Sequence, residues 1–290
     1  MRDAIEAIEN ALTRKAAGGF LTPPRHYFAT PRGALTFTIG GDADEGVLGF
    51  RVYAMLPGAR EDEQLVVVYD AATGSLRGIV HGARAGAIRT GALGGIAVKY
   101  GACTDATSVA VIGSGRQART QLEAVAVVRG LSDVRVYSRS TEKREAFASE
   151  MTATLGVPVR PVDKPKTAIA GADIVIVATS SKAPVFPATL IEPGMHVTTI
   201  RLGIGQHELD PAVAERAGAV FTDSLEQLRD YPGGFFLRDR LDSIAALSDH
   251  VASGLPVRTS TGLITLYLSA GLSGTEVVVA DLALRRATIT

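Results

Sequence analysis

The sequence predicts an α/β protein in which an antiparallel meander precedes a parallel sheet covered by helices. Four β-rich segments follow one another in the first part of the chain with no helical pattern between them. From Ser108 onward, apolar strands alternate with helical segments, an order that gives right-handed crossovers and a parallel sheet. The run Ile174–Val177 is apolar throughout, as in a strand buried on both faces.

The composition limits the kind of partner and compartment. The 290 residues include 30 basic and 30 acidic ones, so the formal net charge is zero and favours neither nucleic acid nor a membrane as a partner. The single cysteine, Cys103, excludes an intramolecular disulfide and a multi-cysteine metal site, and we expect no metal. The chain starts with an acidic amphipathic helix and holds no run of about 18 apolar residues. We therefore expect a cytoplasmic protein whose partner is a small molecule or another protein.

The first part of the chain should form a helix, the meander and a second helix. Ile5, Ile8 and Leu12 share one helical face at about residues 3–17, before Gly18-Gly19. The strands are expected at Ala34–Ile39, Val47–Leu56, Gln64–Asp70 and Leu76–Val80, with a hairpin turn at Asp70–Gly74. Ala83–Tyr100 has helical spacing and leads to the polar break Thr104–Thr107.

The second part should alternate strands and helices. The strands are expected at Ser108–Ile112, Val134–Tyr137, Val157–Arg160, Asp173–Ala178, Met195–Ile200 and Ala219–Thr222. Helices are expected from Arg116, over Thr141–Thr154 and near Lys166. From Leu241 the pattern is helical, and we predict closing helices at Gly262–Ala270 and Gly274–Ala287 that return to the first part.

A glycine-rich loop follows the first strand of the parallel sheet. In Gly113-Ser114-Gly115-Arg116-Gln117-Ala118, the first glycine permits a tight turn, the second lets the backbone approach a pyrophosphate, and Ala118 allows close helix packing. The N–H groups that begin the next helix would face the phosphates. A glycine turn without a ligand is the alternative, but the strand before the loop and the helix after it favour a Rossmann-type dinucleotide site. Its phosphate-binding residues would be Gly113, Ser114, Gly115, Arg116 and Gln117.

The residues after the second strand of that sheet bear on which dinucleotide binds. An enzyme that prefers NAD usually has an acidic residue there, whereas this chain has Ser138-Arg139-Ser140. A serine hydroxyl carries no charge, and Arg139 can pair with a 2′-phosphate. We predict NADP as cofactor with NAD as the alternative. These residues could instead only begin the next helix, with Ser140 or Thr141 as its cap.

Arg89 stands among small and apolar residues on the helical segment Ala83–Tyr100. A buried guanidinium without an anion costs several kcal/mol, on the order estimated for unpaired buried charges. Either a protein carboxylate or a substrate carboxylate must therefore meet it.

Several motifs in this order resemble the ornithine cyclodeaminase/mu-crystallin family. They are Arg89-Thr90, Val111–Ala118, Ala178–Ser181, Pro193–Val197 and Glu208-Leu209. The resemblance implies a Rossmann domain, residues 105–257, inserted in a discontinuous α+β substrate-binding and dimerisation domain, residues 1–104 and 258–290. It also implies a homodimer, with Thr90, Thr179 and Ser180 beside the cofactor.

The resemblance further implies a cationic substrate site. Arg89 would bind the substrate carboxylate, and Arg25 and Arg51 match positions of cationic contacts in the family. Arginine stays protonated, so the candidates for proton transfer are His81 and His207, which we expect to be catalytic unless they are ordinary surface histidines. Tyr53 and water are left open.

Three departures from the family pattern argue against ornithine cyclisation. Arg51 stands where a lysine is usual, the loop Arg201–His207 lacks a carboxylate, and Leu35–Thr38 has no acidic residue. We expect an NADP-dependent oxidoreductase that reduces an imine, or a keto acid plus amine, to a small amino acid, or the reverse. The alternatives are a cyclodeaminase or lyase that recycles NAD and a non-catalytic, NADP-dependent ligand-binding protein of the crystallin type.

Overall fold

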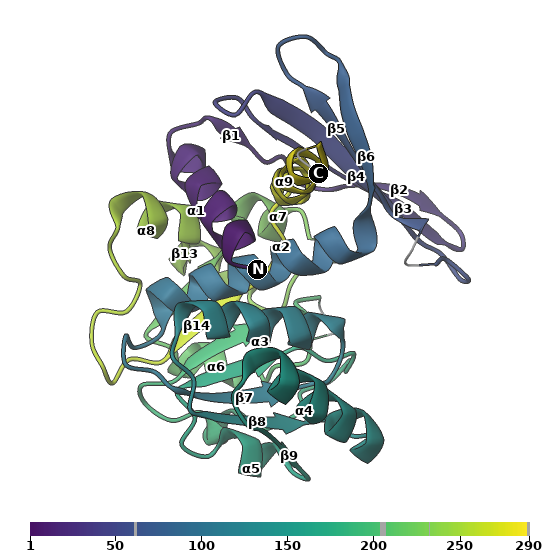
Figure 1. The fold of residues 1–290 in the computed structure, drawn as a ribbon. Coiled ribbons are helices and arrows are strands. Elements are labelled where there is room, and N and C mark those ends of the chain that lie inside the picture. The colour runs from purple at the N-terminus through teal and green to yellow at the C-terminus, as the bar shows by residue number, and fades with distance from the viewer. Residues whose placement is uncertain (61–62, 204–206, 232, 289–290) are drawn as a thin grey trace. The chain divides into compact units, whose positions relative to one another are not determined.

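The computed structural model describes residues 1–60, 63–203, 207–231 and 233–288 (Figure 1). The chain divides into two compact units. The parallel-sheet unit comprises Met1 and Thr90–Ala270, and the meander unit comprises Arg2–Arg89 and Gly271–Thr290. The units thus divide the chain at 89/90 and 270/271, whereas the sequence places the limits at 104/105 and 257/258.

The parallel-sheet unit confirms the predicted α/β class. Its described residues form an 8-stranded sheet in the order β13-β12-β14-β11-β10-β7-β8-β9, and every neighbouring pair is parallel. The strands are β7 (Ser108–Ile112), β8 (Asp133–Tyr137), β9 (Val159–Val162), β10 (Ile174–Val177), β11 (His196–Thr199), β12 (Ala219–Thr222), β13 (Ile244–Ala246) and β14 (Thr265–Leu268). The helices are α3 (Arg116–Val128), α4 (Thr141–Leu155), α5 (Pro165–Ile169), α6 (Ala212–Arg216), α7 (Leu225–Arg229), α8 (Leu247–Ser253) and the short η2 (Ala188–Leu190) and η3 (Arg238–Ser243).

Helices cover both faces of this sheet, which explains why its central strand β10 is apolar at every position. Alternate side chains of a strand point to opposite faces. Val109 and Val111 of β7 belong to the core that includes residues of α3 and α4, whereas Ala110 and Ile112 belong to the core that includes α5. Figure 1 shows α5 on the opposite side of β7 and β8 from α3.

The prediction of a helix at Gly262–Ala270 is wrong. Residues Thr265–Leu268 form β14, which lies between β11 and β12 and pairs with both in parallel register. The segment is short and mostly apolar, and periodicity alone does not distinguish a strand buried on both faces from a buried helix. Its β-branched and aromatic residues are the signal that favoured a strand. After Leu241 the chain likewise forms β13 before α8, not a continuous helix.

The meander unit contains a 6-stranded sheet in its described residues. The order is β1-β3-β4-β5-β6, with β2 paired to β3, and all pairs are antiparallel. The strands are β1 (Phe20–Leu21), β2 (His26–Thr30), β3 (Gly33–Asp42), β4 (Val47–Met55), β5 (Leu65–Asp70) and β6 (Leu76–His81). Strands β1 and β2 were not predicted, because β1 is only two residues long and β2 is almost wholly exposed.

Helix α9 (Thr275–Thr288) packs on one face of the meander sheet, beside α1 (Arg2–Ala16) (Figure 1). Glycines permit this close packing: a Cβ at Gly40 would lie 2.5 Å from the Cα of Gly274, at the start of α9. On β4 the buried Val47, Gly49 and Arg51 alternate with Leu48, Phe50 and Val52 on the opposite face. The α9 side of the sheet therefore carries Arg51.

Helix α2 (Gly82–Gly101) contains the last residues of the meander unit and the first of the parallel-sheet unit. Within the latter, Gly91, Gly94 and Gly95 let it approach α3, since a Cβ at Gly95 would lie 2.9 Å from the Cβ of Ala124. The carbonyl of Thr90 accepts a hydrogen bond of 2.9 Å from the buried side-chain amide of Gln121. In the described part of the chain, none of the helices combines the length and the hydropathy needed to cross a membrane.

Candidate active site

The glycine-rich loop has the geometry expected of a phosphate loop. Gly113 has φ +120°, and a Cβ there would overlap the carbonyl oxygen of Ala178, so only glycine fits. At Gly115, by contrast, no atom lies within 4 Å of the position that a Cβ would take. Gly115 precedes α3 and supplies no side-chain cap, so the first N–H groups of the helix are available to a ligand.

The side chains of this loop leave its outer surface open. Arg119 of α3 donates hydrogen bonds to the carbonyls of Ser114 (2.6 Å) and Gly115 (3.2 Å), which holds the loop against the helix. Arg116 is exposed, and the buried Oε1 of Gln117 has no hydrogen-bond partner among the described residues. These residues fit a pyrophosphate bound over the loop.

The three residues after β8 play different structural roles. Ser140 caps α4, since its side chain accepts a hydrogen bond of 3.2 Å from the N–H of Lys143. The alternative that these residues begin the next helix therefore applies to Ser140, which is its cap residue. Ser138 Oγ donates to the carbonyl of Ser140 at 3.0 Å, and Arg139 is exposed. Arg144, which follows Lys143 in α4, donates to the carbonyl of Ser138 at 3.2 Å.

A buried carboxylate that we did not predict as a site residue organises the segment after β10. Glu208 Oε2 accepts hydrogen bonds from the N–H (2.5 Å) and the hydroxyl (2.7 Å) of Thr179, while Oε1 accepts from Thr199 and from the N–H of Ile200. Burial raises the pKa of Glu208 to about 7, although these hydrogen bonds act in the opposite direction. Glu208 thus positions Thr179, whereas Ser180 is exposed. Its occurrence in the Glu208-Leu209 motif was the only signal in the sequence.

Two predicted arginines meet in the meander unit on one carboxylate. Arg89 Nη2 lies 3.1 Å and Arg51 Nη1 lies 3.2 Å from the same oxygen, Oε1 of Glu276 in the first turn of α9. Arg51 also donates to Gln64, and its Cζ lies 4.4 Å from the centre of the Tyr53 ring. Burial by itself would raise the pKa of Glu276, but attraction to Arg89 and then to Arg51 lowers it below its usual value. Glu276 is therefore ionised at neutral pH.

Arg25 joins this arginine cluster, which we define as Arg25, Arg51 and Arg89. Its Nη2 donates to the carbonyl of Gly271 at 3.0 Å, and its charge also lowers the pKa of Glu276. Gly271 has φ +89°, and a Cβ there would overlap Arg25 and lie 3.1 Å from Arg89 Nη1. The cluster carries three positive charges around one carboxylate, so an anion can bind beside it.

Of the two kinds of carboxylate that could meet Arg89, the structure shows one from the protein, that of Glu276. Glu276 was not predicted, because it follows Arg89 by most of the length of the chain and no local pattern marks it. The ion pair with Glu276 engages only one of the three guanidinium nitrogens of Arg89, Nη2. Arg89 Nε and Nη1 are buried and have no hydrogen-bond partner among the described residues, and the whole side chain is 8% exposed. Substrate binding by Arg89 therefore remains a prediction.

The two candidate histidines lie in different units. His81 pairs with Leu65 and thus shares the sheet face of Val52, opposite the face of Arg51. His207 is half-buried and stacks on Phe236 with ring centres 5.1 Å apart. The structure does not bring His81 into the arginine cluster. Residues 204–206 of the loop without a carboxylate lie outside the described residues.

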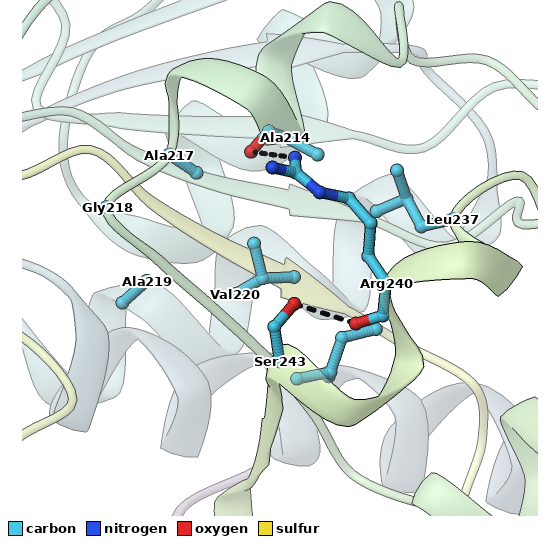
Figure 2. A pocket seen from close by; sticks show the side chains of 9 residues that line it. Ala214, Ala217, Gly218, Ala219, Val220, Leu237, Arg240 and Ser243 are labelled. Atoms are coloured by element: carbon cyan, nitrogen blue, oxygen red, sulfur yellow. Dashed lines mark hydrogen bonds between the residues drawn. The ribbon is translucent and has the colours of Figure 1, made fainter.

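A cavity away from all these residues lies in the parallel-sheet unit. It has a volume of about 190 Å³ and is lined mainly by small and apolar side chains around β12 and β13 (Figure 2). Its polar groups are already engaged, since Arg240 donates to the carbonyl of Ala214 and Ser243 donates to that of Arg240. No predicted site residue lines it. Within the described ranges, no group of His, Cys, Asp and Glu side chains is arranged to hold a metal.

Comparison with known proteins gives full-length matches. The model of the ornithine cyclodeaminase/mu-crystallin family matches residues 1–288. A Delta(1)-pyrroline-2-carboxylate reductase of Bacillus cereus is 29% identical over 304 residues, which cover 99% of this chain and 92% of the relative. A putative dehydrogenase of Rhizobium meliloti is 35% identical over 206 residues, 69% of this chain but only 62% of that relative, less than two thirds of its length.

Solved structures with the same fold cover the whole chain. The Delta(1)-pyrroline-2-carboxylate reductase of Thermococcus litoralis, in complex with NADH and L-proline, has a TM-score of 0.91 at 28% identity and covers 100% of this chain and 94% of its own. An archaeal alanine dehydrogenase dimer with bound NAD has a TM-score of 0.87 at 26% identity and covers 100% of this chain and 92% of its own.

The raised pKa of Glu208 predicts a pH dependence of stability. A carboxyl group whose folded pKa is about 7 binds protons more tightly than in the unfolded chain, where its pKa is 4.5. Its stabilising contribution is complete below the unfolded pKa and is lost as pH rises through about 7. Relative to Glu208→Gln, which does not titrate, the wild-type free energy of unfolding should fall by on the order of 2–3 kcal/mol between pH 5 and pH 7.5, measured by urea unfolding.

The exposed Glu145→Gln is the control for this measurement and should leave the wild-type profile unchanged. Parallel profiles for wild type and Glu208→Gln over the same pH interval would show that burial does not raise the pKa of Glu208.

Proposed function

Because this chain belongs to the ornithine cyclodeaminase/mu-crystallin family, we propose that it is a nicotinamide-dependent reductase of small 2-imino acids. The reaction reduces the C=N bond of an imine, or of the imine formed from a keto acid and an amine, to an amino acid; the enzyme also catalyses the reverse. The observation that carries this proposal is the buried Arg89, whose Nε and Nη1 have no hydrogen-bond partner among the described residues after its pair with Glu276. The pyrroline-2-carboxylate reductases among the relatives support it.

Arg89 binds the substrate carboxylate in this proposal. A carboxylate accepts two parallel N–H bonds from a guanidinium, which fixes both position and orientation. Arg25 and Arg51 add positive charge in the same unit, so the site attracts an anionic substrate. Binding in one orientation supplies much of the rate enhancement when the reacting atoms are held together.

The cofactor supplies or accepts a hydride at nicotinamide C4. The loop Gly113–Gln117 binds its pyrophosphate, and Thr90, Thr179 and Ser180 border it. The open space over Gly115 and the uncapped start of α3 support this role of the loop. Glu208 keeps Thr179 in place through two hydrogen bonds.

NADP is the preferred form of the cofactor in this proposal. The support is the exposed Arg139 beside an uncharged Ser138, where an acidic residue would repel a 2′-phosphate. Ser140 adds little, since its side chain caps α4. NAD remains the alternative, and both solved relatives described above carry NADH or NAD.

We also propose that the protein forms a homodimer. The face of the meander sheet opposite α9 is apolar and exposed: Phe28 is 68%, Ile79 54% and Leu48 43% exposed. Such a face is unfavourable in water unless another surface covers it. A second copy of the chain, as in the archaeal alanine dehydrogenase dimer, is the partner that we propose.

Replacing Arg89 tests the proposed function. Arg89→Ala and Arg89→Lys remove bidentate recognition, which should cost about 2–4 kcal/mol of transition-state stabilisation, or roughly 30- to 1000-fold in kcat/KM. Affinity for the dinucleotide should change much less. The assay follows oxidation of the reduced cofactor with cyclic imines and 2-oxo acids, with and without amines. Arg84→Ala, an exposed arginine of the same helix, is the matched control.

Near-normal efficiency of Arg89→Ala would refute the carboxylate role. Product formation without net oxidation of cofactor would instead identify an enzyme that recycles it. Tight dinucleotide binding with no turnover of any substrate would identify a ligand-binding protein.

Cofactor preference is tested by a charge reversal after β8. Charge-assisted hydrogen bonds of about 1.5–3 kcal/mol would give the wild type roughly a 10- to 150-fold preference for NADP. Ser138→Asp combined with Arg139→Ala should invert that preference in calorimetry at moderate salt. Lys143→Ala removes a nearby exposed charge and should leave the ratio unchanged. Equal affinity of the wild type for NAD and NADP contradicts the assignment.

Light scattering tests the dimer. The wild type should have twice the mass of one chain at micromolar concentration. Ile79→Glu places a charge on the apolar sheet face and should shift the mass toward that of a monomer. Leu255→Glu changes a leucine of the parallel-sheet unit that is 64% exposed, and should leave the dimer intact. A monomeric wild type would rule out the second copy as the cover of this face.

A further inference from the structure

Within the described residues, only one of the two carboxylate oxygens of Glu276 has a partner. Both guanidinium contacts, from Arg89 and Arg51, fall on Oε1. Oε2 is buried and has no hydrogen-bond partner among the described residues. A buried charged oxygen without a partner costs free energy that a purely structural ion pair would avoid by using both oxygens. The arrangement is explained if a ligand supplies a donor to Oε2.

The same ion pair offers donors as well as an acceptor. Nε and Nη1 of Arg89 are also buried without partners in the part of the chain that the structure describes. A ligand that satisfies both sides must carry an acceptor pair for the guanidinium and an N–H or O–H donor for the carboxylate. A 2-imino acid with a protonated nitrogen has this combination on adjacent carbons, and as a zwitterion it adds no net charge to the cluster.

We propose that Glu276 binds the substrate nitrogen: Oε2 accepts the N–H of a protonated imine whose carboxylate is held by Arg89. This assignment rests on the proposed function and extends it from an imine reductase to one that selects the iminium form. A 2-oxo acid presents a carbonyl oxygen in place of the N–H. Two acceptors then face each other without a proton between them, so the keto acid binds less well.

With this assignment the hydride step needs no proton donor from the protein. Hydride adds to the carbon of C=N–H⁺, and the electron pair of the C=N bond moves to nitrogen, which keeps its proton and becomes a neutral amine. The reduced nicotinamide gives up the hydride and is oxidised. No acid has to act in this step, so the chain can carry Arg51 in place of a lysine. The amine then takes a proton from water.

The charges around Glu276 keep it ready to accept that N–H. The groups that face it are Arg89 from α2, Arg51 from β4 and Arg25 from the segment between β1 and β2. All three are cations, and together they lower the pKa of Glu276 against the effect of burial. The carboxylate therefore stays ionised at the pH at which an imine is protonated.

A pair of isosteric ligands tests the assignment without turnover. Pyrrole-2-carboxylate carries an N–H next to its carboxylate, whereas furan-2-carboxylate has an oxygen there. The full-length wild type with oxidised cofactor should bind the pyrrole at least about tenfold more tightly in calorimetry, the preference that one hydrogen bond to a charged group gives. In Glu276→Gln the ratio should fall to within about threefold, while both ligands still bind through Arg89.

A merely structural role of Glu276 would weaken both ligands alike and leave the ratio unchanged. If Glu276→Gln does not fold, Glu276→Asp keeps the charge but withdraws the oxygen, and should lower the ratio. Equal affinity of the wild type for the two ligands overturns the assignment, whatever the variants do. If those ligands bind equally and Arg89→Ala weakens both, the proposed function stands without it. If Arg89→Ala changes neither affinity nor turnover, the proposed function itself fails.

Discussion

In the core of the meander unit, two guanidinium groups from different elements share one carboxylate oxygen. Arg89 comes from α2 and Arg51 from β4, and Glu276 lies at the start of α9. Removing one member of such a buried group typically costs about 3–5 kcal/mol, because it leaves an uncompensated charge. Small residues make room for it: a Cβ at Gly86 would lie 2.7 Å from the Cζ of Arg51. The ion pair thus joins the sheet, its covering helix and the helix that leads into the other unit.

The surroundings of the two buried glutamates shift the pKa values of their carboxyl groups in opposite directions. Glu276 lies among arginines, which lower its pKa, so it stays charged. Glu208 is held by hydrogen bonds alone, and burial raises its pKa to about 7. Glu276 therefore remains an anion and orients the arginines around it. Glu208 supports Thr179 after β10 and changes its protonation near neutral pH.

The presence of Arg51 at a position where the family usually has a lysine is explained by this arrangement. Arg51 cannot donate a proton as a lysine could, and it serves instead to hold Glu276 and stack on Tyr53. A substrate that arrives with its proton already on nitrogen needs no acid from the protein. Binding energy then goes into holding a zwitterion in one orientation, which is the task that a rigid ion pair performs well.

The sequence by itself determined what depends on neighbouring residues. The strand, glycine loop and helix from Ser108 to Ala118 are contiguous, so turn geometry and apolar pattern could be read directly. The need of Arg89 for an anion also followed from its immediate neighbours. Only the tertiary structure decided that this anion is Glu276, which also pairs with Arg51, 225 residues before it in the chain, because no periodic pattern links these residues. It likewise decided that Thr265–Leu268 is a strand, because a short apolar run is compatible with helix or strand until its neighbours β11 and β12 supply the hydrogen bonds.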